Sequence, residues 1–174
     1  GTHGHDNMEI LTCVLKGAIS HKDSMGNAGD IKPGEWQLMS AGTGVRHSEI
    51  NQYDEDVHLF QIWIIPNVKD AEPTYQQIQL DPKDAPNQWH LIAGPNENAP
   101  MHLRQDAEVK TAVLEAGQSL DVNKTQTFNY IHVVEGEVEI AGQTVKTGDA
   151  LMFDENSTVK ANQNTQMIWF DLPR

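Results

Sequence analysis

Two short histidine motifs are the part of this chain best suited to chemistry. His3 and His5 are separated by one residue, and His47 and Glu49 form a second pair with the same spacing. Residues i and i+2 of a β-strand project to the same face of a sheet, so each pair can direct two side chains toward one point. Three imidazoles and one carboxylate can bind a divalent metal and leave positions open on a five- or six-coordinate ion. The pattern therefore predicts one catalytic metal site made of His3, His5, His47 and Glu49.

The donor set also indicates which ions the site could bind. Three nitrogens and one carboxylate oxygen suit Fe(II), and Ni, Mn, Co, Cu or Zn are compatible with the same donors. Gly42 and Gly44 allow a tight turn before the strand that carries His47 and Glu49. The alternative interpretation is that a His-x-His pair on a polar strand face is solvated and binds nothing.

The elements that would position these side chains are short β-strands. The chain consists of short apolar or alternating segments rich in β-branched residues and separated by glycine, asparagine and proline, and it contains no convincing amphipathic helix. Evenly spaced strands of this kind predict an all-β sandwich or barrel. The expected strands are Glu9–Leu15, Ala18–Lys22, Glu35–Met39, Val45–Ile50, Val57–Ile65, Trp89–Ala93, Val109–Glu115, Phe128–Val134, Glu137–Ala141, Ala150–Phe153, Thr158–Ala161 and Met167–Asp171.

A proline-rich stretch divides the chain into two parts. Pro66 to Pro86 holds four prolines among charged and polar residues, which is typical of a linker or crossover. We place the domain boundary near residue 80. The expected organisation is a first domain over residues 1–80, which carries the metal site, and a second domain over residues 81–174.

A weak internal repeat supports two copies of one β-unit. Val14–Gly17 resembles Val133–Gly136, and Lys32–Glu35 resembles Lys146–Asp149. In both halves the first segment is a strand that ends in glycine, and the second is a tight turn that leads into another strand.

The second half lacks a plausible set of metal ligands. When the two halves are aligned on these glycines, Val122 and Lys124 occupy the places of His3 and His5, and Ala161 and Gln163 occupy those of His47 and Glu49. We therefore expect the second half to be free of metal. The other histidines are interpreted as ordinary polar or core residues, although His58 could line a barrel; they are His21, His58, His90, His102 and His132. The four tryptophans and Cys13 are expected to be core residues.

Composition restricts the partners and the compartment. The formal net charge of −13 disfavours direct binding to nucleic acid or to anionic lipid. No apolar run approaches the roughly 20 residues of a membrane span, and no signal peptide is evident. A single cysteine fits a reducing compartment, so we expect the protein to be cytoplasmic. We also expect it to be a monomer. The chain opens at Gly1 without an initiator methionine, which suggests a fragment or a trimmed product.

Five segments together are similar to a known family. They are residues 3–17 (HGHDNMEILTCVLKG), 21–27 (HKDSMGN), 31–49 (IKPGEWQLMSAGTGVRHSE), 59–63 (LFQIW) and 73–76 (PTYQ). These segments resemble the pirin family of bicupins, and within it the bacterial group similar to quercetin 2,3-dioxygenase. The resemblance is dense to about residue 77 and looser to the end.

The resemblance implies a fold and a set of ligands. It implies two cupin-type barrels (double-stranded β-helix or jelly-roll) in tandem, the first without its N-terminal strands in this chain. It also implies that His3, His5, His47 and Glu49 are the metal ligands. Glu9, whose counterpart is a ligand in many other cupins, is then expected to act as a structural residue or to support the ligands.

The implied activity is that of a metal-dependent dioxygenase that cleaves a flavonol such as quercetin with O₂. Glu49 would double as the proton acceptor. One alternative is a metal-binding regulatory protein that acts through a protein partner. Another is a cupin enzyme with a different small substrate, because one fold hosts many chemistries.

Overall fold

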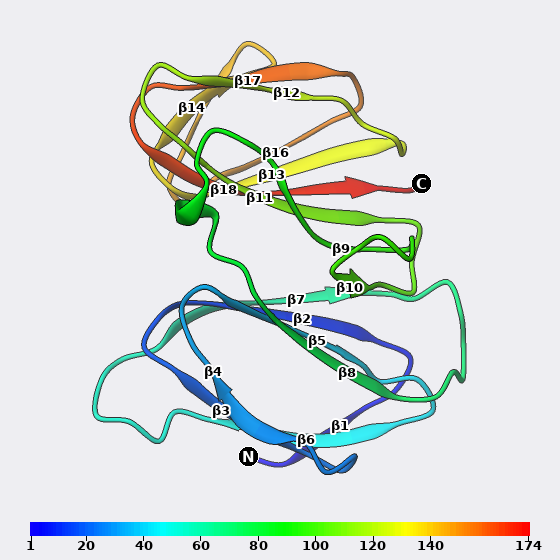
Figure 1. Ribbon diagram of the computed structural model, residues 1–174. Coiled ribbons are helices and arrows are strands. Elements are labelled where there is room, and N and C mark those ends of the chain that lie inside the picture. Colours follow the sequence, from blue (N-terminus) through cyan, green and yellow to red (C-terminus); the bar gives the residue numbers. More distant parts are fainter. The chain divides into compact units, whose positions relative to one another are not determined.

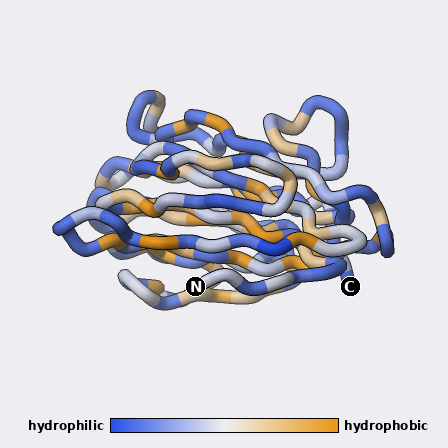
Figure 2. Tube along the Cα trace, turned by 90° about the horizontal axis from the view of Figure 1, so that it is seen from below, coloured by the Kyte–Doolittle hydropathy of each residue, from blue (hydrophilic) through white to orange (hydrophobic).

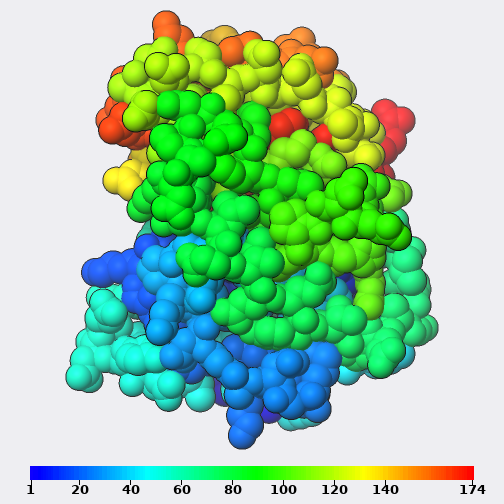
Figure 3. Space-filling model, viewed as in Figure 1, coloured from blue at the N-terminus to red at the C-terminus, as the bar shows by residue number.

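The computed structural model describes residues 1–174 and consists almost entirely of β-strands (Figure 1), which confirms the predicted all-β class. The chain forms two compact units. The first comprises residues 1–81 and 101–105, and the second comprises residues 82–100 and 106–174. In the space-filling view, blue and cyan atoms belong to the first unit and yellow to red atoms to the second (Figure 3). None of the helical structure is long or apolar enough to cross a membrane.

The first unit is built from two four-stranded antiparallel sheets. One sheet has the strand order β1-β6-β3-β4 and the other has the order β7-β2-β5-β8. The strands are β1(His3–His5), β2(Glu9–Lys16), β3(Ile19–Asp23), β4(Ala28–Ile31), β5(Glu35–Ser40), β6(Val45–Ile50), β7(His58–Ile64) and β8(Thr74–Gln79), and the short β10(Met101–His102) lies in the returning segment of this unit.

Apolar side chains from both sheets of the first unit pack against each other. Ile10 and Met39 of one sheet belong to the same apolar cluster as Val45 of the other, and all three are almost fully buried. Apolar and polar residues alternate along many of the strands, as the hydropathy colouring shows (Figure 2). Because successive side chains of a strand point to opposite faces, this alternation gives each sheet an inner face. Cys13 is buried as expected, and burial, followed by the charge of Asp81, raises the pKa of its thiol to about 12.

The second unit repeats this arrangement. One sheet has the order β12-β17-β14-β15, and the other runs β9-β11-β18-β13-β16. Its apolar core includes Ile131, Val159 and Trp169. The elements are the 3₁₀ turn η1(Pro82–Asp84) and the strands β9(His90–Gly94), β11(Glu108–Leu114), β12(Ser119–Val122), β13(Phe128–Glu135), β14(Glu137–Ile140), β15(Gln143–Lys146), β16(Ala150–Phe153), β17(Ser157–Ala161) and β18(Thr165–Leu172).

The two segment pairs that suggested a repeat occupy equivalent places. Strands β2 and β13 each end with a register shift followed by a glycine of positive φ, Gly17 (71°) and Gly136 (106°). The turn after Lys32 and the turn after Lys146 are closed by the same hydrogen bond, from the fourth residue's N–H to the lysine carbonyl, at 2.9 and 2.8 Å. The predicted internal repeat is therefore present in the fold.

Two expectations about the first unit were wrong. The stretch from Pro66 to Pro86 is not only a linker, because it contains β8, which pairs with β5 along its whole length. Three of the six residues of β8 are glutamines, so this strand gave no apolar signal. Trp63 is not a core residue, because 56% of its surface is exposed. Trp36 and Trp169, by contrast, are buried as expected.

Candidate metal centre

Strands β1 and β6 bring the two histidine motifs together. They pair antiparallel with His3 opposite His47, so the three residues His3, His5 and His47 share one face of the sheet. The turn that leads into β6 depends on Gly42, which has a φ of 48° and lies against the backbone of Ala71. A Cβ at this position would lie 2.0 Å from the Ala71 carbonyl oxygen, so only glycine fits there.

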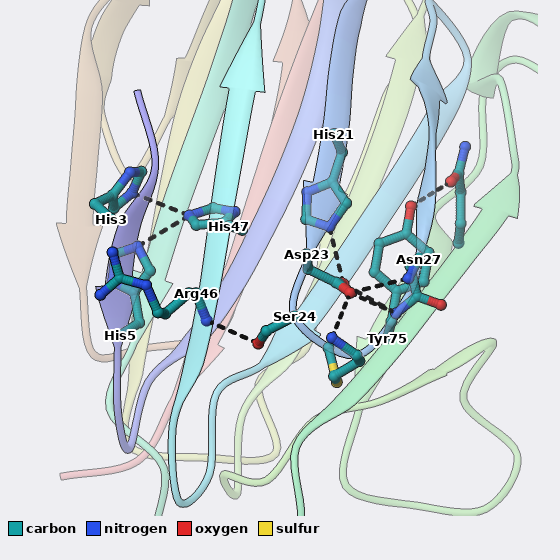
Figure 4. Close-up of polar contacts among 11 residues, drawn as sticks. His3, His5, His21, Asp23, Ser24, Asn27, Arg46, His47 and Tyr75 are labelled. Carbon is teal, nitrogen blue, oxygen red and sulfur yellow. Dashed lines mark hydrogen bonds and ion pairs between the residues drawn. The ribbon is translucent and has the colours of Figure 1, made fainter.

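The three imidazoles converge on one point through their Nε2 atoms (Figure 4). The Nε2 atom of His47 lies 3.0 Å from that of His3 and 3.1 Å from that of His5. Two ligands about 2.1 Å from an ion and at right angles to each other are about 3 Å apart. The spacing of these nitrogens therefore fits three adjacent positions around one metal ion.

Two of these imidazoles, those of His47 and His5, have lowered pKa values, which favours their neutral form. Burial, followed by the neighbouring histidines His3, His21 and His5, lowers the pKa of His47 to about 4. The pKa of His5 is also lowered, first by burial and then by His3. A neutral imidazole offers a lone pair, and several lone pairs directed at one point favour a cation between them.

Glu49 lies next to this cluster but is not part of it. Its carboxylate, His47 and His21 form a second group, in which one donor atom of each residue lies within 4.8 Å of the others. Gln61 donates a hydrogen bond from Nε2 to Oε2 of Glu49 at 2.6 Å. The other oxygen, Oε1, is buried and has no hydrogen-bond partner. Glu49 is thus fixed on one side and has an oxygen available on the other.

His21 belongs to the site although sequence reasoning assigned it an ordinary role. Strand β3 pairs with β6 so that His21 is opposite Glu49 and Asp23 is opposite His47. Both side chains therefore point to the same face as the candidate ligands, and His21 is only 2% exposed. The signal was available, because His21 and Asp23 have the same i, i+2 spacing as the two motifs that were recognised.

Asp23 holds His21 and also closes the β3–β4 hairpin. Its Oδ2 atom lies 3.0 Å from Nε2 of His21. Its carboxylate also accepts hydrogen bonds from the backbone N–H groups of Met25 and Asn27 and from the Asn27 side chain. Burial raises the pKa of Asp23, but the hydrogen bonds from His21, Asn27 and Met25 outweigh it and hold the pKa below its ordinary value. Asp23 is therefore a carboxylate anchor beside the site.

The cluster is open to solvent on the His3 side. His3 is exposed and His5 is partly exposed. A shallow depression of about 440 Å³ lies beside His5 and is bordered by Gly4, Gly44 and Arg46. The indole of Trp63 lies 5.2 Å from the His5 ring, measured between ring centres. A small molecule could reach the nitrogens from this side.

Glu9 lies outside both groups of candidate ligands. Its Oε2 atom accepts hydrogen bonds from the Ser40 hydroxyl at 2.8 Å and from the Arg104 backbone N–H at 3.3 Å. Burial raises the pKa of Glu9, an effect that these hydrogen bonds partly oppose. Its contacts tie the returning segment of the first unit to β2.

The matching sheet of the second unit has an apolar inner face. In place of imidazoles and carboxylates it packs aliphatic side chains, among them Val122, Val138 and Val159. Lys124 and Gln163, which the repeat alignment placed at ligand positions, lie beyond the ends of β12 and β17. His90 in this unit contacts the carbonyl oxygen of Ala85 at 2.7 Å through Nε2.

Comparison with known proteins gives concordant matches over both units. Residues 1–64 match the Pirin family and residues 91–172 match the quercetinase C-terminal cupin domain. Quercetin 2,3-dioxygenase of Escherichia coli K12 is 40% identical over 99% of this chain and 76% of its own length. The crystal structure of the bacterial pirin YhhW from Escherichia coli, in complex with nickel(II), superimposes with a TM-score of 0.92 at 36% identity, covering 99% of this chain and 76% of that one. A further structure of YhhW gives the same values except for a coverage of 75%.

Proposed function

Because the chain belongs to the pirin family of cupin proteins, we propose that it is a metal-dependent dioxygenase that cleaves a flavonol such as quercetin with O₂. The observation that carries this proposal is the convergence of three imidazoles, whose Nε2 atoms lie 3.0 and 3.1 Å apart. The similarity to a quercetin 2,3-dioxygenase supports the substrate class, and the similarity to a pirin in complex with nickel(II) supports a divalent metal.

In this proposal His3, His5, His47 and Glu49 hold one divalent ion. Three imidazoles and a carboxylate suit Fe(II), and Ni(II) is the alternative that the related structure favours. When bound, the ion supplies Lewis-acid chemistry and a template that brings O₂ and the substrate together. Metal analysis of the purified protein, element by element, decides between the two ions.

The side chains of this site also bind and deprotonate the substrate. A flavonol enters over the exposed His3 and the partly exposed His5, where the Trp63 indole offers an aromatic surface. The Glu49 carboxylate accepts the proton of a substrate hydroxyl, because Gln61 holds one oxygen and leaves the other without a partner. The resulting oxyanion reacts with O₂, which is the oxidant. C–O bonds form at C2 and C4 of the flavonol, the C2–C3 and C3–C4 bonds break, both oxygen atoms enter the ester product, and C3 leaves as carbon monoxide.

The test measures oxygen uptake and flavonol loss in the same sample. Protein loaded with Fe(II) under anaerobic conditions, and separately with Ni(II), is mixed with quercetin and air-saturated buffer. We expect one O₂ consumed for each quercetin that loses its long-wavelength absorbance. His47→Ala removes the imidazole common to both groups of candidate ligands and should lower the rate at least about 100-fold.

His58→Ala is the matched control, since His58 is an exposed histidine of β7 outside both groups. This variant should keep the wild-type rate. If metal-loaded wild-type protein leaves quercetin intact, the substrate is wrong. If His47→Ala turns quercetin over as fast as the wild type, the site is wrong.

A further inference from the structure

Two ring nitrogens next to the candidate metal centre are buried without a hydrogen-bond partner. They are Nδ1 of His47 and Nδ1 of His21, and the two residues are 1% and 2% exposed. A buried polar atom without a partner costs free energy, so such atoms usually serve a purpose. Neither nitrogen is needed to bring the three Nε2 atoms together.

The surroundings of each ring determine which nitrogen carries the proton. His47 directs Nε2 toward His3 and His5, so binding a cation there requires a lone pair on Nε2 and leaves the proton on Nδ1. His21 directs Nε2 toward the Asp23 carboxylate, which can only accept, so the tautomer of His21 that fits this contact has its proton on Nε2 and a lone pair on Nδ1. The two unpartnered nitrogens are therefore a donor and an acceptor.

The two rings lie close enough to interact. Strands β3 and β6 are hydrogen-bonded neighbours, and the ring centres of His21 and His47 are 5.4 Å apart. Figure 4 shows the rings side by side, with His3 and His5 beyond His47 and Asp23 below His21. The Tyr75 ring packs on His21 at 5.1 Å and limits its rotation. A hydrogen bond between the Nδ1 atoms, direct or through one water molecule, would complete both rings.

We propose that His21, anchored by Asp23, is a positioning residue that accepts a hydrogen bond from the Nδ1–H group of His47. This bond would hold the His47 ring in the tautomer and orientation that direct its Nε2 lone pair at the metal ion. Metal-binding histidines generally donate their second N–H group to such a partner, which raises their basicity as ligands. The inference rests on the proposed metal site but not on the identity of the substrate.

A different role for His21 would be as a ligand in its own right. His21, His47 and Glu49 form a group with metal-binding donors. Because Nε2 of His21 is engaged with Asp23, only Nδ1 would be available, and that is the atom assigned here to the hydrogen bond. The ¹⁵N shift of Nδ1 of His21 in Zn(II)-loaded protein distinguishes a metal ligand from a hydrogen-bond acceptor.

The experiment compares His21→Leu with His21→Asn, two residues of similar size. The Asn side chain can place an oxygen acceptor near the position of the original Nδ1, whereas Leu has none. Apo-protein is titrated with Ni(II) in a calorimeter. We expect His21→Leu to bind one ion with 10- to 100-fold weaker affinity, and His21→Asn to recover most of the wild-type affinity. The thermal midpoint of each apo-protein reports whether it is folded, and His21→Met replaces His21→Leu if the latter does not fold.

A second measurement reports the tautomer directly. In Zn(II)-loaded protein with ¹⁵N-labelled histidine, the Nδ1–H group of His47 should give a slowly exchanging, hydrogen-bonded signal. We expect this signal in the wild type and in His21→Asn, and its loss in His21→Leu. A purely structural role for His21 would not remove this signal while the protein still binds its metal.

The outcomes separate this inference from the proposed function. Equal Ni(II) affinity for all three proteins would overturn the positioning role and leave the proposed function standing. A ¹⁵N shift typical of metal coordination at Nδ1 of His21 in the Zn(II)-loaded wild type would make His21 a ligand and also overturn it. Wild-type protein that binds one ion but does not attack quercetin would overturn the proposed function alone. Wild-type protein that binds no ion would overturn both.

Discussion

Each unit contains a four-stranded sheet with an equivalent strand order, but the inner faces of these two sheets carry different side chains. In the first unit the sheet β1-β6-β3-β4 presents three imidazoles, and next to them a histidine–aspartate pair and a glutamate. In the second unit the sheet β12-β17-β14-β15 presents aliphatic side chains such as Val138 and Val159. The strand order therefore does not determine whether this face is a site or a core. The side chains at a few inward positions do.

This difference has an energetic side. An aliphatic inner face is stabilised by burial, at about 25 cal/mol for each Å² of apolar surface removed from water. The first unit gives up part of that stabilisation and in addition buries polar atoms without partners, Nδ1 of His21 and His47 and Oε1 of Glu49. Functional sites commonly reduce stability in this way, because their groups are arranged for a ligand.

The largest predicted effect on stability comes from a charge placed on the apolar inner face of the second unit's sheet β12-β17-β14-β15. Val159→Asp buries a carboxylate among apolar side chains, where no cation compensates it. We expect a loss of about 4 kcal/mol in the free energy of unfolding, measured by urea denaturation with tryptophan fluorescence. The control is Lys160→Asp, which changes the adjacent exposed residue and should cost less than about 1 kcal/mol. Equal losses would show that the inner face is not a packed core.

A second prediction tests whether Gly17 and Gly136, which follow equivalent strands in the two units, are required for the same steric reason. A Cβ on Gly136 would lie 2.5 Å from the carbonyl oxygen of Asn164, and one on Gly17 would lie 2.7 Å from that of Asp56. Steric conflict adds to the cost of a positive φ, which is about 1–2 kcal/mol. We expect Gly136→Ala and Gly17→Ala each to lower the unfolding free energy by about 3 kcal/mol in the same urea experiment.

Gly148→Ala is the matched control for the glycines. Gly148 also has a positive φ, 84°, but a Cβ there meets no atom within 4 Å. Its replacement should cost only about 1–2 kcal/mol, the cost of the positive φ without a steric conflict. If all three variants lost the same amount, backbone conformation alone would explain the requirement for glycine.

The smallest predicted effect concerns Gln61, which supports Glu49 in the first unit. Gln61→Leu removes the 2.6 Å hydrogen bond to Oε2 of Glu49 but leaves every candidate ligand in place. We expect about tenfold weaker Ni(II) binding, since groups that orient ligands contribute on this scale. The control is Gln143→Leu, an exposed glutamine on β15 of the second unit, which should bind Ni(II) as the wild type does. An unchanged affinity in Gln61→Leu would mean that Glu49 needs no support.

Much of the fold could be predicted because its signals are local. The strands with apolar cores, such as β2 and β13, follow from periodicity, and the repeat follows from the glycines that end those strands. Strand β8 could not be predicted, because its sequence TYQQIQ is mostly polar and its pairing with β5 is a long-range contact. Periodicity reports burial, and a half-exposed edge strand carries little of it.

From the sequence, the candidate site could be predicted only for the side chains carried by strands β1 and β6. The His3–His5 and His47–Glu49 motifs indicated their own strands, but they did not show that β3 pairs with β6 and adds His21 and Asp23. That information lies in the register of the sheet. The sequence alone also did not show that Glu49 belongs to an overlapping group and not to the cluster of three imidazoles.

The carboxylate of Asp23 links a surface turn to the interior of the first unit. The turn after β3 is closed on this carboxylate by Met25 and Asn27, and Ser24 exchanges hydrogen bonds with the backbone of Arg46, the residue before His47. Replacing this four-residue loop with another of equal length would therefore change the position of the Asp23 carboxylate and, through it, the orientation of the His21 ring. The sequence of this exposed turn is therefore constrained by the candidate site as well as by the stability of the hairpin.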